Sequence, residues 1–297
     1  MLSQLNHNEL HSISKQLDGM LLKHVNWVTL LHKTIVCNLP PSDSLAMHHK
    51  DCDFGKWYYS MTHPMIIENP DFMQLEIMHK ILHTKANSIL DKYINNVSTT
   101  ENEYDLFLDS EKEFFNTLNN FIDNVLAIQS QFDNLTNIPN RNLVNTMLDK
   151  EYNKFTRNEN DEYYIAFADI DYFKHVNDTY GHAAGDTVLR EVSKYFSTGI
   201  RPYDTLGRYG GEEFIFCFSQ TSLNETNKIL ERIRIGIKDL PIRIDKTNTI
   251  KVTCSFGISK LQSDTSLIET INQSDNAMYV AKNNGRNRIE VWSKDQA

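Results

Sequence analysis

Cysteine is scarce in this sequence of 297 residues, and long apolar runs are absent. The four cysteines are widely spaced with no CxxC pair, which argues against a disulfide framework and fits a reducing compartment. No window approaches the roughly 18 to 20 consecutive apolar residues that span a bilayer. The N-terminus also lacks the basic segment and apolar run of a secretory signal. We therefore expect a cytoplasmic protein with no membrane segment.

Basic residues are also fewer than acidic residues. Lys and Arg total 30 against 39 Asp and Glu, which gives a net charge of −9 with neutral histidine. A nucleic-acid coat or a polybasic membrane anchor needs a positive field, so we expect neither. A phosphate ligand held by a few local cations is compatible with this balance. The hydrophobic content of 40% is ordinary for a folded protein and excludes wholesale disorder.

The first 132 residues show helical periodicity, with little glycine or proline inside the periodic stretches. Three apolar seams advance by alternating steps of three and four residues, over residues 17–35, 72–93 and 104–132. A shorter helix fits residues 53–61. Four antiparallel helices that bury these seams against one another are the simplest arrangement. We expect an N-terminal four-helix bundle over residues 1–132.

Residues 133–297 mix short apolar strands with helices. Strands are expected at 163–168, 205–209, 214–218, 249–258 and 289–292, and helices at 140–155, 186–196, 222–238 and 267–283. The second and third strands flank Gly210 and Gly211, which indicates a hairpin. This order predicts an α/β sandwich, with a central, mostly antiparallel sheet and helices on both faces. The expected fold class is therefore α plus α/β, in two domains.

The positions of certain histidines in the first domain suggest a metal site. His24 and His79 occupy core positions of otherwise apolar seams, and His83 lies one helical turn after His79. A buried imidazole without partners costs roughly 1 to 3 kcal/mol, and a shared metal would satisfy several imidazoles at once. Cys52 could add a thiolate, and three nitrogens with one sulfur suit Zn²⁺ better than Mg²⁺ or Ca²⁺. The alternative is a set of hydrogen-bonded core histidines beside a buried thiol.

The motifs Hx₂W, CxFGxW and HxxxH resemble the chemoreceptor zinc-binding (CZB) domain, over roughly residues 10–130. The resemblance implies a four-helix bundle whose zinc is held by three histidines and a cysteine. Residue by residue these ligands are His24, Cys52, His79 and His83, with one regulatory Zn²⁺ per subunit.

Three signals in the second domain point to phosphate chemistry, although each alone is also typical of an ordinary turn or helix end. Asp169 ends a buried strand, which would hold its carboxylate rigidly at the rim of a sheet, a suitable place for Mg²⁺. Gly210 and Gly211 at the hairpin turn allow positive φ and let a nucleotide approach the backbone closely. Lys282 and Arg286 could contribute cations for a polyphosphate.

Together these signals resemble the GGDEF family of diguanylate cyclases, over about residues 133–293. The signature is RYGGEEF at 208–214, the GGEEF variant that active members carry. The segments DNLTNIPNR at 133–141, DIDYFKHVND at 169–178 and GHAAGD at 181–186 also match. The order of the two domains resembles zinc-responsive diguanylate cyclases as a whole. The resemblance implies that two GTP condense to cyclic di-GMP and two pyrophosphates, with one GTP held by each subunit of a homodimer.

The family's functional residues carry over to the matching positions of this chain. Asp169, the Ile170 carbonyl and Glu212 would hold two Mg²⁺ per active site. Glu212 or Glu213 would be the base for the attacking 3′-hydroxyl, and strand alternation should point them to opposite faces, so that only one faces the metals; we favour Glu212. The substrate-binding positions implied are Lys174, Asn177, His182, Asp186, Gly210, Gly211, Lys282 and Arg286.

Within that set, the resemblance assigns the guanine edge to Asn177 and Asp186. It assigns the β- and γ-phosphates to Lys282 and Arg286, with help from Lys174. His182 lies on the same substrate-binding stretch.

The family also has a product-inhibition site of the form RxxD, five residues before the signature. Arg201 and Asp204 have this spacing, and Arg232 is a further candidate contact. A guanidinium binds phosphate and guanine, while a carboxylate accepts from the guanine edge. In the resembling proteins zinc inhibits, and we expect zinc to change how two cyclase domains face each other. The alternatives are a catalytically silent receptor for cyclic di-GMP and a class III-type cyclase that makes cyclic GMP.

Overall fold

The computed structural model describes residues 7–42, 45, 47–158 and 161–293. The chain divides into two compact units, Met1–Ser130 and Gln131–Ala297. Among the described residues, no helix combines the length and the apolar character needed to cross a membrane.

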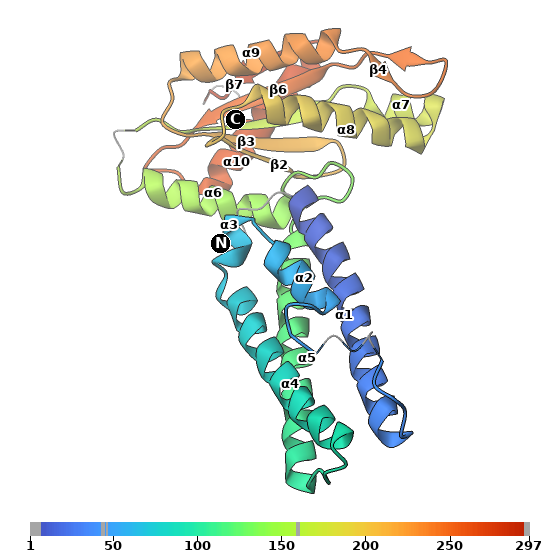
Figure 1. Cartoon of the computed structure of the whole chain (residues 1–297). Helices are drawn as coiled ribbons and strands as arrows, with labels where there is room; N and C mark the ends of the chain where they lie inside the picture. The colour runs from blue at the N-terminus through green and yellow to red at the C-terminus, as the bar shows by residue number, and fades with distance from the viewer. Residues whose placement is uncertain (1–6, 43–44, 46, 159–160, 294–297) are drawn as a thin grey trace. The chain divides into compact units, whose positions relative to one another are not determined.

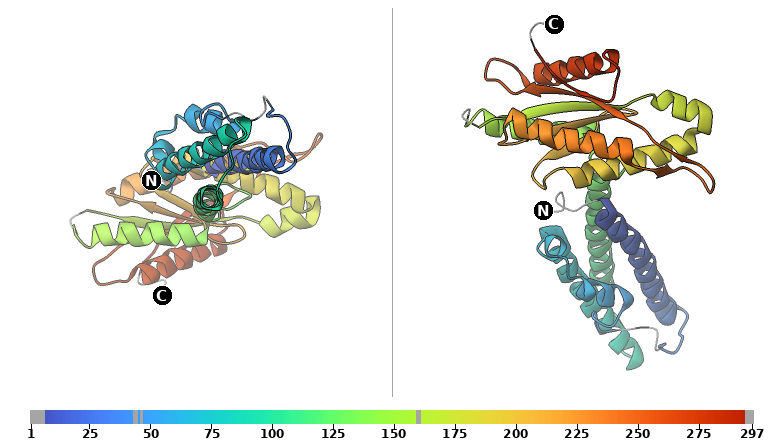
Figure 2. Two further views of the ribbon diagram at one scale, coloured as in Figure 1. Left: turned by 60° about the horizontal axis from the view of Figure 1, so that its bottom comes forward. Right: turned by 90° about the horizontal axis from the view of Figure 1, so that it is seen from above.

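The first unit is helical. Its helices within the described residues are, in chain order, α1 (His7–Val36), α2 (Asp53–Ser60), α3 (Pro64–Ile67), α4 (Pro70–Ile94) and α5 (Glu101–Gln129). The three long helices lie side by side (Figures 1 and 2). α5 begins at a capping box, in which Thr100 and Glu103 bind each other's backbone amides. The short helix expected at 53–61 is α2, whereas α3 was not expected.

The seams of the long helices form the interior of this unit. Leu17, Leu75 and Phe114 are fully buried, one from each helix, as the periodicity predicts. The third seam was expected to run to Phe132, but α5 ends at Gln129. Phe132 instead forms an isolated antiparallel bridge with Pro139 in the second unit.

The second unit is built on one mixed sheet. Its strand order is β2-β3-β1-β6-β7, and every neighbouring pair is antiparallel except β6-β7. The bounds are β1 (Tyr164–Ile170), β2 (Thr205–Arg208), β3 (Glu213–Phe218), β6 (Cys254–Lys260) and β7 (Ile289–Val291). β4 (Ile242–Arg243) and β5 (Thr249–Ile250) form a separate two-stranded sheet. The expected mostly antiparallel sheet and the β2-β3 hairpin are confirmed.

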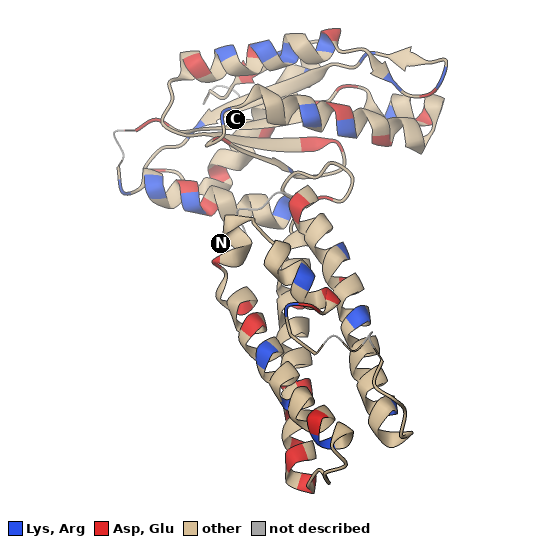
Figure 3. Ribbon diagram, viewed as in Figure 1, with Lys and Arg blue, Asp and Glu red and all other residues tan. Residues whose placement is uncertain are grey.

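Helices cover both faces of the sheet (Figure 1). They are α6 (Arg141–Phe155), α7 (Phe173–Tyr180), α8 (His182–Gly199), α9 (Leu223–Asp239) and α10 (Leu267–Asn283). Alternate residues of β1 divide between two cores: Ile165 and Phe167 pack with α6 and α10, while Tyr164 and Ala166 pack with α8 and α9. Lys and Arg are interspersed with Asp and Glu along α8 and α9 (Figure 3).

Two sequence predictions fail in this unit. The single strand expected at 249–258 is instead two strands, β5 paired with β4 and β6 in the main sheet, and Thr253 between them is bound to Asp171. The Asp171 amide donates to the Thr253 carbonyl at 2.8 Å, and the Thr253 hydroxyl donates to the Asp171 carboxylate at 2.6 Å. α7 was not expected, since it is short and no side-chain hydrogen bond caps its start at Tyr172.

Candidate metal and nucleotide sites

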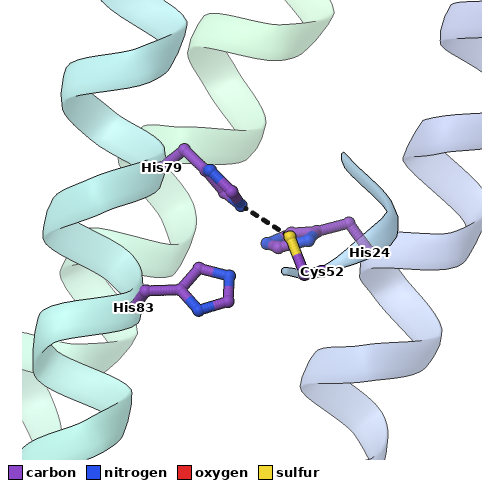
Figure 4. Close-up of side chains that lie close together, drawn as sticks. All are labelled: His24, Cys52, His79 and His83. Atoms are coloured by element: carbon purple, nitrogen blue, oxygen red, sulfur yellow. Dashed lines mark hydrogen bonds between the residues drawn. The ribbon is translucent and has the colours of Figure 1, made fainter. Parts of the chain in front are cut away.

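Four side chains of the first unit converge on one point. His24 projects from α1, His79 and His83 from α4, and Cys52 from the segment before α2 (Figure 4). One ligand atom from each lies within 4.8 Å of the others, and all four residues are buried. The Cys52 Sγ and His79 Nε2 atoms are 3.2 Å apart. The arrangement brings together three nitrogens and one sulfur, which is the donor set of a structural zinc site.

Burial keeps the three imidazoles neutral, which is the form that ligates a metal. It lowers the pKa of His24 to about 3 and that of His83 to about 4, and it lowers the pKa of His79 still further. His83 Nδ1 lies 2.9 Å from the Met47 carbonyl, so this nitrogen carries the hydrogen and Nε2 presents its lone pair. The Nε2 atoms of His24 and His83 are buried without a hydrogen-bond partner among the described residues. A metal ion fits these orphaned atoms.

Cys52 is held by a tight turn at the start of α2. Its Sγ accepts from the Gly55 amide at 3.2 Å, as the N-cap of the helix. A Cβ on Gly55 would lie 1.9 Å from the His49 carbonyl oxygen, so only glycine fits this close approach. Burial raises the pKa of the Cys52 thiol, so a metal ion would have to displace the thiol proton to bind sulfur.

The second unit carries a cluster of carboxylates at the end of β1. Asp169 is 4% exposed, and its Oδ2 lies 2.7 Å from the Lys282 ammonium of α10. Its Oδ1 is buried and has no partner among the described residues. The pKa of Asp169 is raised to about 6, because burial and the charges of Glu212 and Glu213 raise it more than Lys282 lowers it. The orphaned oxygen among three carboxylates fits a divalent cation such as Mg²⁺.

The two glutamates are placed differently from the sequence prediction. β3 begins at Glu213, which pairs with Asp169 in the ladder, so Glu212 lies just outside the strand and alternation does not fix its direction. Burial raises the pKa of Glu212, while the Lys282 charge lowers it. Glu212 therefore lies within electrostatic range of both Asp169 and Lys282. Its backbone carbonyl accepts from the Ile170 amide at 3.3 Å, which ties the turn to the end of β1.

The GGEEF turn does not use the positive φ that glycine permits. Among the described glycines only Gly181 and Gly285 have positive φ. The turn is closed because the amides of Tyr209 and Gly210 both donate to the Glu213 carbonyl. The Arg208 guanidinium braces it by donating to the Gly211 carbonyl, at 2.6 Å from Nη2, and to the Asp133 carboxylate, at 2.8 Å from Nη1.

The remaining predicted substrate residues lie on α7, α8 and the segment after α10. The Asn177 amide packs against Gly185, the neighbour of Asp186, since a Cβ on Gly185 would lie 2.0 Å from Asn177 Oδ1. His182 is the first residue of α8 and is exposed. Lys174 is exposed on the first turn of α7.

The predicted RxxD residues form a compact turn. The Arg201 amide donates to Asp204 Oδ2 at 3.0 Å, while Asp204 Oδ1 is buried without a partner among the described residues. Burial raises the pKa of Asp204. Both residues line a cavity of about 290 Å³. Arg232 of α9 donates to the Gly199 carbonyl at 2.6 Å, which places it beside the segment that leads into Arg201.

Sequence reasoning missed the role of Asp171. This carboxylate is 3% exposed and accepts from the Thr253 and Ser255 hydroxyls and from the Asn287 amide. It fastens the end of β1 to β6 and to the segment after α10. The sequence signal for it is the second Asp of the DID segment at 169–171.

An α/β sandwich with a carboxylate cluster beside a GGEEF hairpin defines a GGDEF-type nucleotide domain. Residues 130–288, more than half of the chain, match the family described as diguanylate cyclase, GGDEF domain, and the chain belongs to this family. Residues 24–90 match the chemoreceptor zinc-binding domain. The resemblances stated from the sequence, and the fold class, are confirmed.

Two curated relatives illustrate the range of similarity. The chain is 29% identical over 286 residues to the diguanylate cyclase DgcZ of Escherichia coli, with 94% of each chain covered. It is 45% identical over 131 residues to diguanylate cyclase A of Treponema denticola, covering 43% of this chain and 34% of that protein.

Solved structures support the fold of the second unit. The chain is similar to the coiled coil and GGDEF domain of DgcB from Caulobacter crescentus in complex with c-di-GMP, at 28% identity and a TM-score of 0.57. The match covers 62% of this chain and 96% of that one. The GGDEF domain of the same protein matches at 31% identity and a TM-score of 0.52, over 54% of this chain and 95% of that one.

Proposed function

We propose that this protein is a Mg²⁺-dependent diguanylate cyclase that joins two GTP molecules into cyclic di-GMP and releases two pyrophosphates. The observation that carries the proposal is the Asp169 carboxylate. One oxygen is buried without a described partner, the other is paired with Lys282, and two glutamates lie within electrostatic range. Membership of the diguanylate cyclase family and similarity to two curated diguanylate cyclases support this reaction.

The cation would be held by Asp169, the Ile170 carbonyl and Glu212, two ions per site. When bound, Mg²⁺ offsets the charge that develops on the phosphates. Glu212 accepts the proton of the attacking 3′-hydroxyl, since burial raises its pKa toward the range of a useful base. Glu213, opposite Asp169 in the ladder, is the second candidate for this role.

The nucleotide is held by groups on three segments. Lys282 and Arg286 bind the β- and γ-phosphates, with help from Lys174 on the first turn of α7. Asn177 and Asp186 bind the guanine edge, because an amide and a carboxylate complement its acceptors and donors. His182, Gly210 and Gly211 complete the predicted substrate surface. Each subunit holds one GTP, so in-line attack requires a homodimer.

Incubation of the purified protein with GTP and Mg²⁺, followed by chromatography, tests the reaction. Linear pppGpG and cyclic di-GMP are the expected products. Cyclic GMP would identify a different cyclase chemistry, and binding of cyclic di-GMP without turnover would identify a silent receptor. Either result would overturn the proposal.

Zinc in the first unit is proposed to inhibit this reaction. The support is the buried, neutral ligand set His24, Cys52, His79 and His83, together with the match to a zinc-binding domain. Turnover measured with and without a strong chelator, in excess Mg²⁺, should rise when zinc is removed. Equal turnover under both conditions would contradict regulation by zinc.

Cyclic di-GMP is proposed to inhibit at the RxxD turn. The unpartnered Asp204 oxygen and the neighbouring cavity suit the donor groups of a guanine edge. Arg201→Ala should abolish inhibition by added cyclic di-GMP and leave the initial rate unchanged. Arg232→Ala should give a partial effect. Product inhibition that persists in Arg201→Ala would rule this site out.

A further inference from the structure

Tyr172 is an unusual residue beside the proposed phosphate-binding groups. Its backbone is left-handed, at φ 58° and ψ 28°, which is uncommon for any residue except glycine and asparagine. The residue is 64% exposed, so core packing does not explain the choice of tyrosine. Tyr172 also starts α7 without a side-chain cap, so it does not serve as an ordinary N-cap.

The ring of Tyr172 lies under the guanidinium of Arg286. The Cζ atom of Arg286 is 4.4 Å from the ring centroid, which is the geometry of a cation–π contact. Arg286 is also left-handed, at φ 62°, and follows Gly285, at φ 112°. Arg286 lies in a turn after α10 and not in a helix. The direction of its guanidinium is therefore set by the contacts that the side chain makes with other residues.

The neighbouring residues tie the same two segments together. Asp171, directly before Tyr172, accepts from the amide of Asn287, directly after Arg286, at 2.9 Å. Arg286 Nη1 lies 3.3 Å from the Lys282 carbonyl. The backbone bond therefore holds the two segments together, and the ring gives the guanidinium a contact on the other segment.

We infer that Tyr172 is a positioning residue, which orients the Arg286 guanidinium toward the terminal phosphates of the nucleotide through a cation–π contact. This inference rests on the proposed function, because it presumes that Arg286 binds the β- and γ-phosphates. A planar guanidinium has a fixed fork of donors, so its orientation decides how many phosphate oxygens it reaches. Tyr172 acts through Arg286 and does not itself touch the reacting atoms.

The test uses a matched pair of ligands that cannot react because they lack the attacking 3′-hydroxyl. 3′-Deoxy-GTP carries the β- and γ-phosphates, and 3′-deoxy-GMP does not. Binding of each in Mg²⁺ is measured by calorimetry for the full-length protein. Tyr172→Leu should weaken 3′-deoxy-GTP about two- to fivefold, the range of an exposed cation–π contact, and leave 3′-deoxy-GMP unchanged. Tyr172→Phe should restore binding, because it keeps the ring.

A double-mutant cycle then shows whether Tyr172 acts through Arg286. In an Arg286→Ala background, Tyr172→Leu should have no further effect. Tyr180→Leu is the matched control, since Tyr180 is another exposed tyrosine on α7. Tyr172→Asn should melt at the same temperature or higher, because asparagine tolerates the left-handed backbone, and yet bind 3′-deoxy-GTP more weakly. A merely structural role predicts that stability and binding fall together.

Equal losses for both ligands, or the same loss with Arg286 present and absent, would overturn the inference. Failure of the wild-type protein to make cyclic di-GMP from GTP would instead overturn the proposed function. The two failures are therefore distinguishable.

Discussion

The two candidate metal sites use burial in opposite ways. In the first unit burial lowers the pKa of three histidines, so the ligands are ready to bind at neutral pH. In the second unit burial raises the pKa of Asp169 to about 6 and also raises that of Glu212, so ionising these ligands costs more than in water, although Asp169 is mostly a carboxylate at pH 7. The same desolvation favours the neutral form in each case. Neutral imidazole is already a ligand, whereas a neutral carboxyl is not.

This difference suits the proposed tasks of the sites. A closed set of nitrogen and sulfur donors suits a resident ion that acts as a regulator. A half-open set of oxygens, balanced by a lysine, suits an ion that arrives with its substrate. The predictions below test this contrast, from the largest expected effect to the smallest.

Asp169→Asn should separate activity from stability. Loss of the carboxylate should lower turnover at least about 10²- to 10³-fold, because the cation site is lost. A folded-state pKa raised to about 6 means that ionisation destabilises the fold as the pH rises through about 4 to 6. The metal-free variant should therefore unfold at pH 7 with a free energy about 1 to 3 kcal/mol higher than the wild type. Product chromatography measures the turnover, and urea unfolding measures the stability. An Asp169→Asn variant that is both active and less stable than the wild type would contradict the proposed difference between the two metal sites.

Cys52→Ala should remove the zinc response without removing the cyclase. Loss of one of four ligands should weaken zinc binding at least about 100-fold, a larger effect than that of losing an outer partner. Turnover should then be the same with and without chelator. Cys37→Ala is the control, since Cys37 is exposed. Metal analysis after dialysis gives the readout, and stoichiometric zinc retained by Cys52→Ala would refute the ligand assignment.

The metal-free first unit should lose stability in acid. Its three ligand histidines have lowered folded-state pKa values, so below pH 6.5 the unfolded chain binds protons that the folded unit does not. Stability should fall by about 2 to 4 kcal/mol per pH unit between pH 6 and pH 4, which is opposite in sign to the effect of Asp169. The fluorescence of Trp27 and Trp57, both buried in this unit, follows its unfolding in urea. A flat profile would mean that these histidines are charged or solvated.

Gly55→Ala should have the mildest effect on zinc. The added Cβ would meet the His49 carbonyl at 1.9 Å, so the turn that carries Cys52 must shift. We expect zinc affinity to fall about tenfold, in the range of a displaced supporting contact. Gly19→Ala on α1 is the matched control, because a Cβ there meets nothing within 4 Å and alanine favours a helix. Competition with a zinc-binding dye measures the zinc affinity of both variants. Unchanged affinity in Gly55→Ala would show that zinc binding does not depend on the turn that carries Cys52.

The sequence was most informative where periodicity decides the structure. The repeat of about 3.6 residues placed His24 and His79 on buried helix faces, and the structure brings them together with Cys52. The β2-β3 hairpin followed from two apolar strands that flank Gly210 and Gly211, and the helix expected at 267–283 is α10. Such features depend on neighbours within a few residues.

The features that the sequence did not predict depend on distant backbone groups. The Met47 carbonyl that orients His83 lies 36 residues away in the chain, and no side-chain pattern encodes its direction. The partners of Asp171 lie 82 to 116 residues away. These bonds to Asp171 accompany the break in the strand expected at 249–258, and they bring Tyr172 close to Arg286. Neither arrangement produces a periodic pattern in the sequence.

The ion pair between Lys282 and Asp169 has one more consequence. At rest the protein keeps its own ammonium on the carboxylate, 2.7 Å away, so the pocket stays close to electrical balance in a metal-poor solution. If Lys282 binds a phosphate as proposed, a cation on the Oδ1 of Asp169, unpartnered among the described residues, would take over the charge balance that Lys282 now gives this carboxylate. We therefore expect ion and nucleotide to enter together, each raising the affinity for the other.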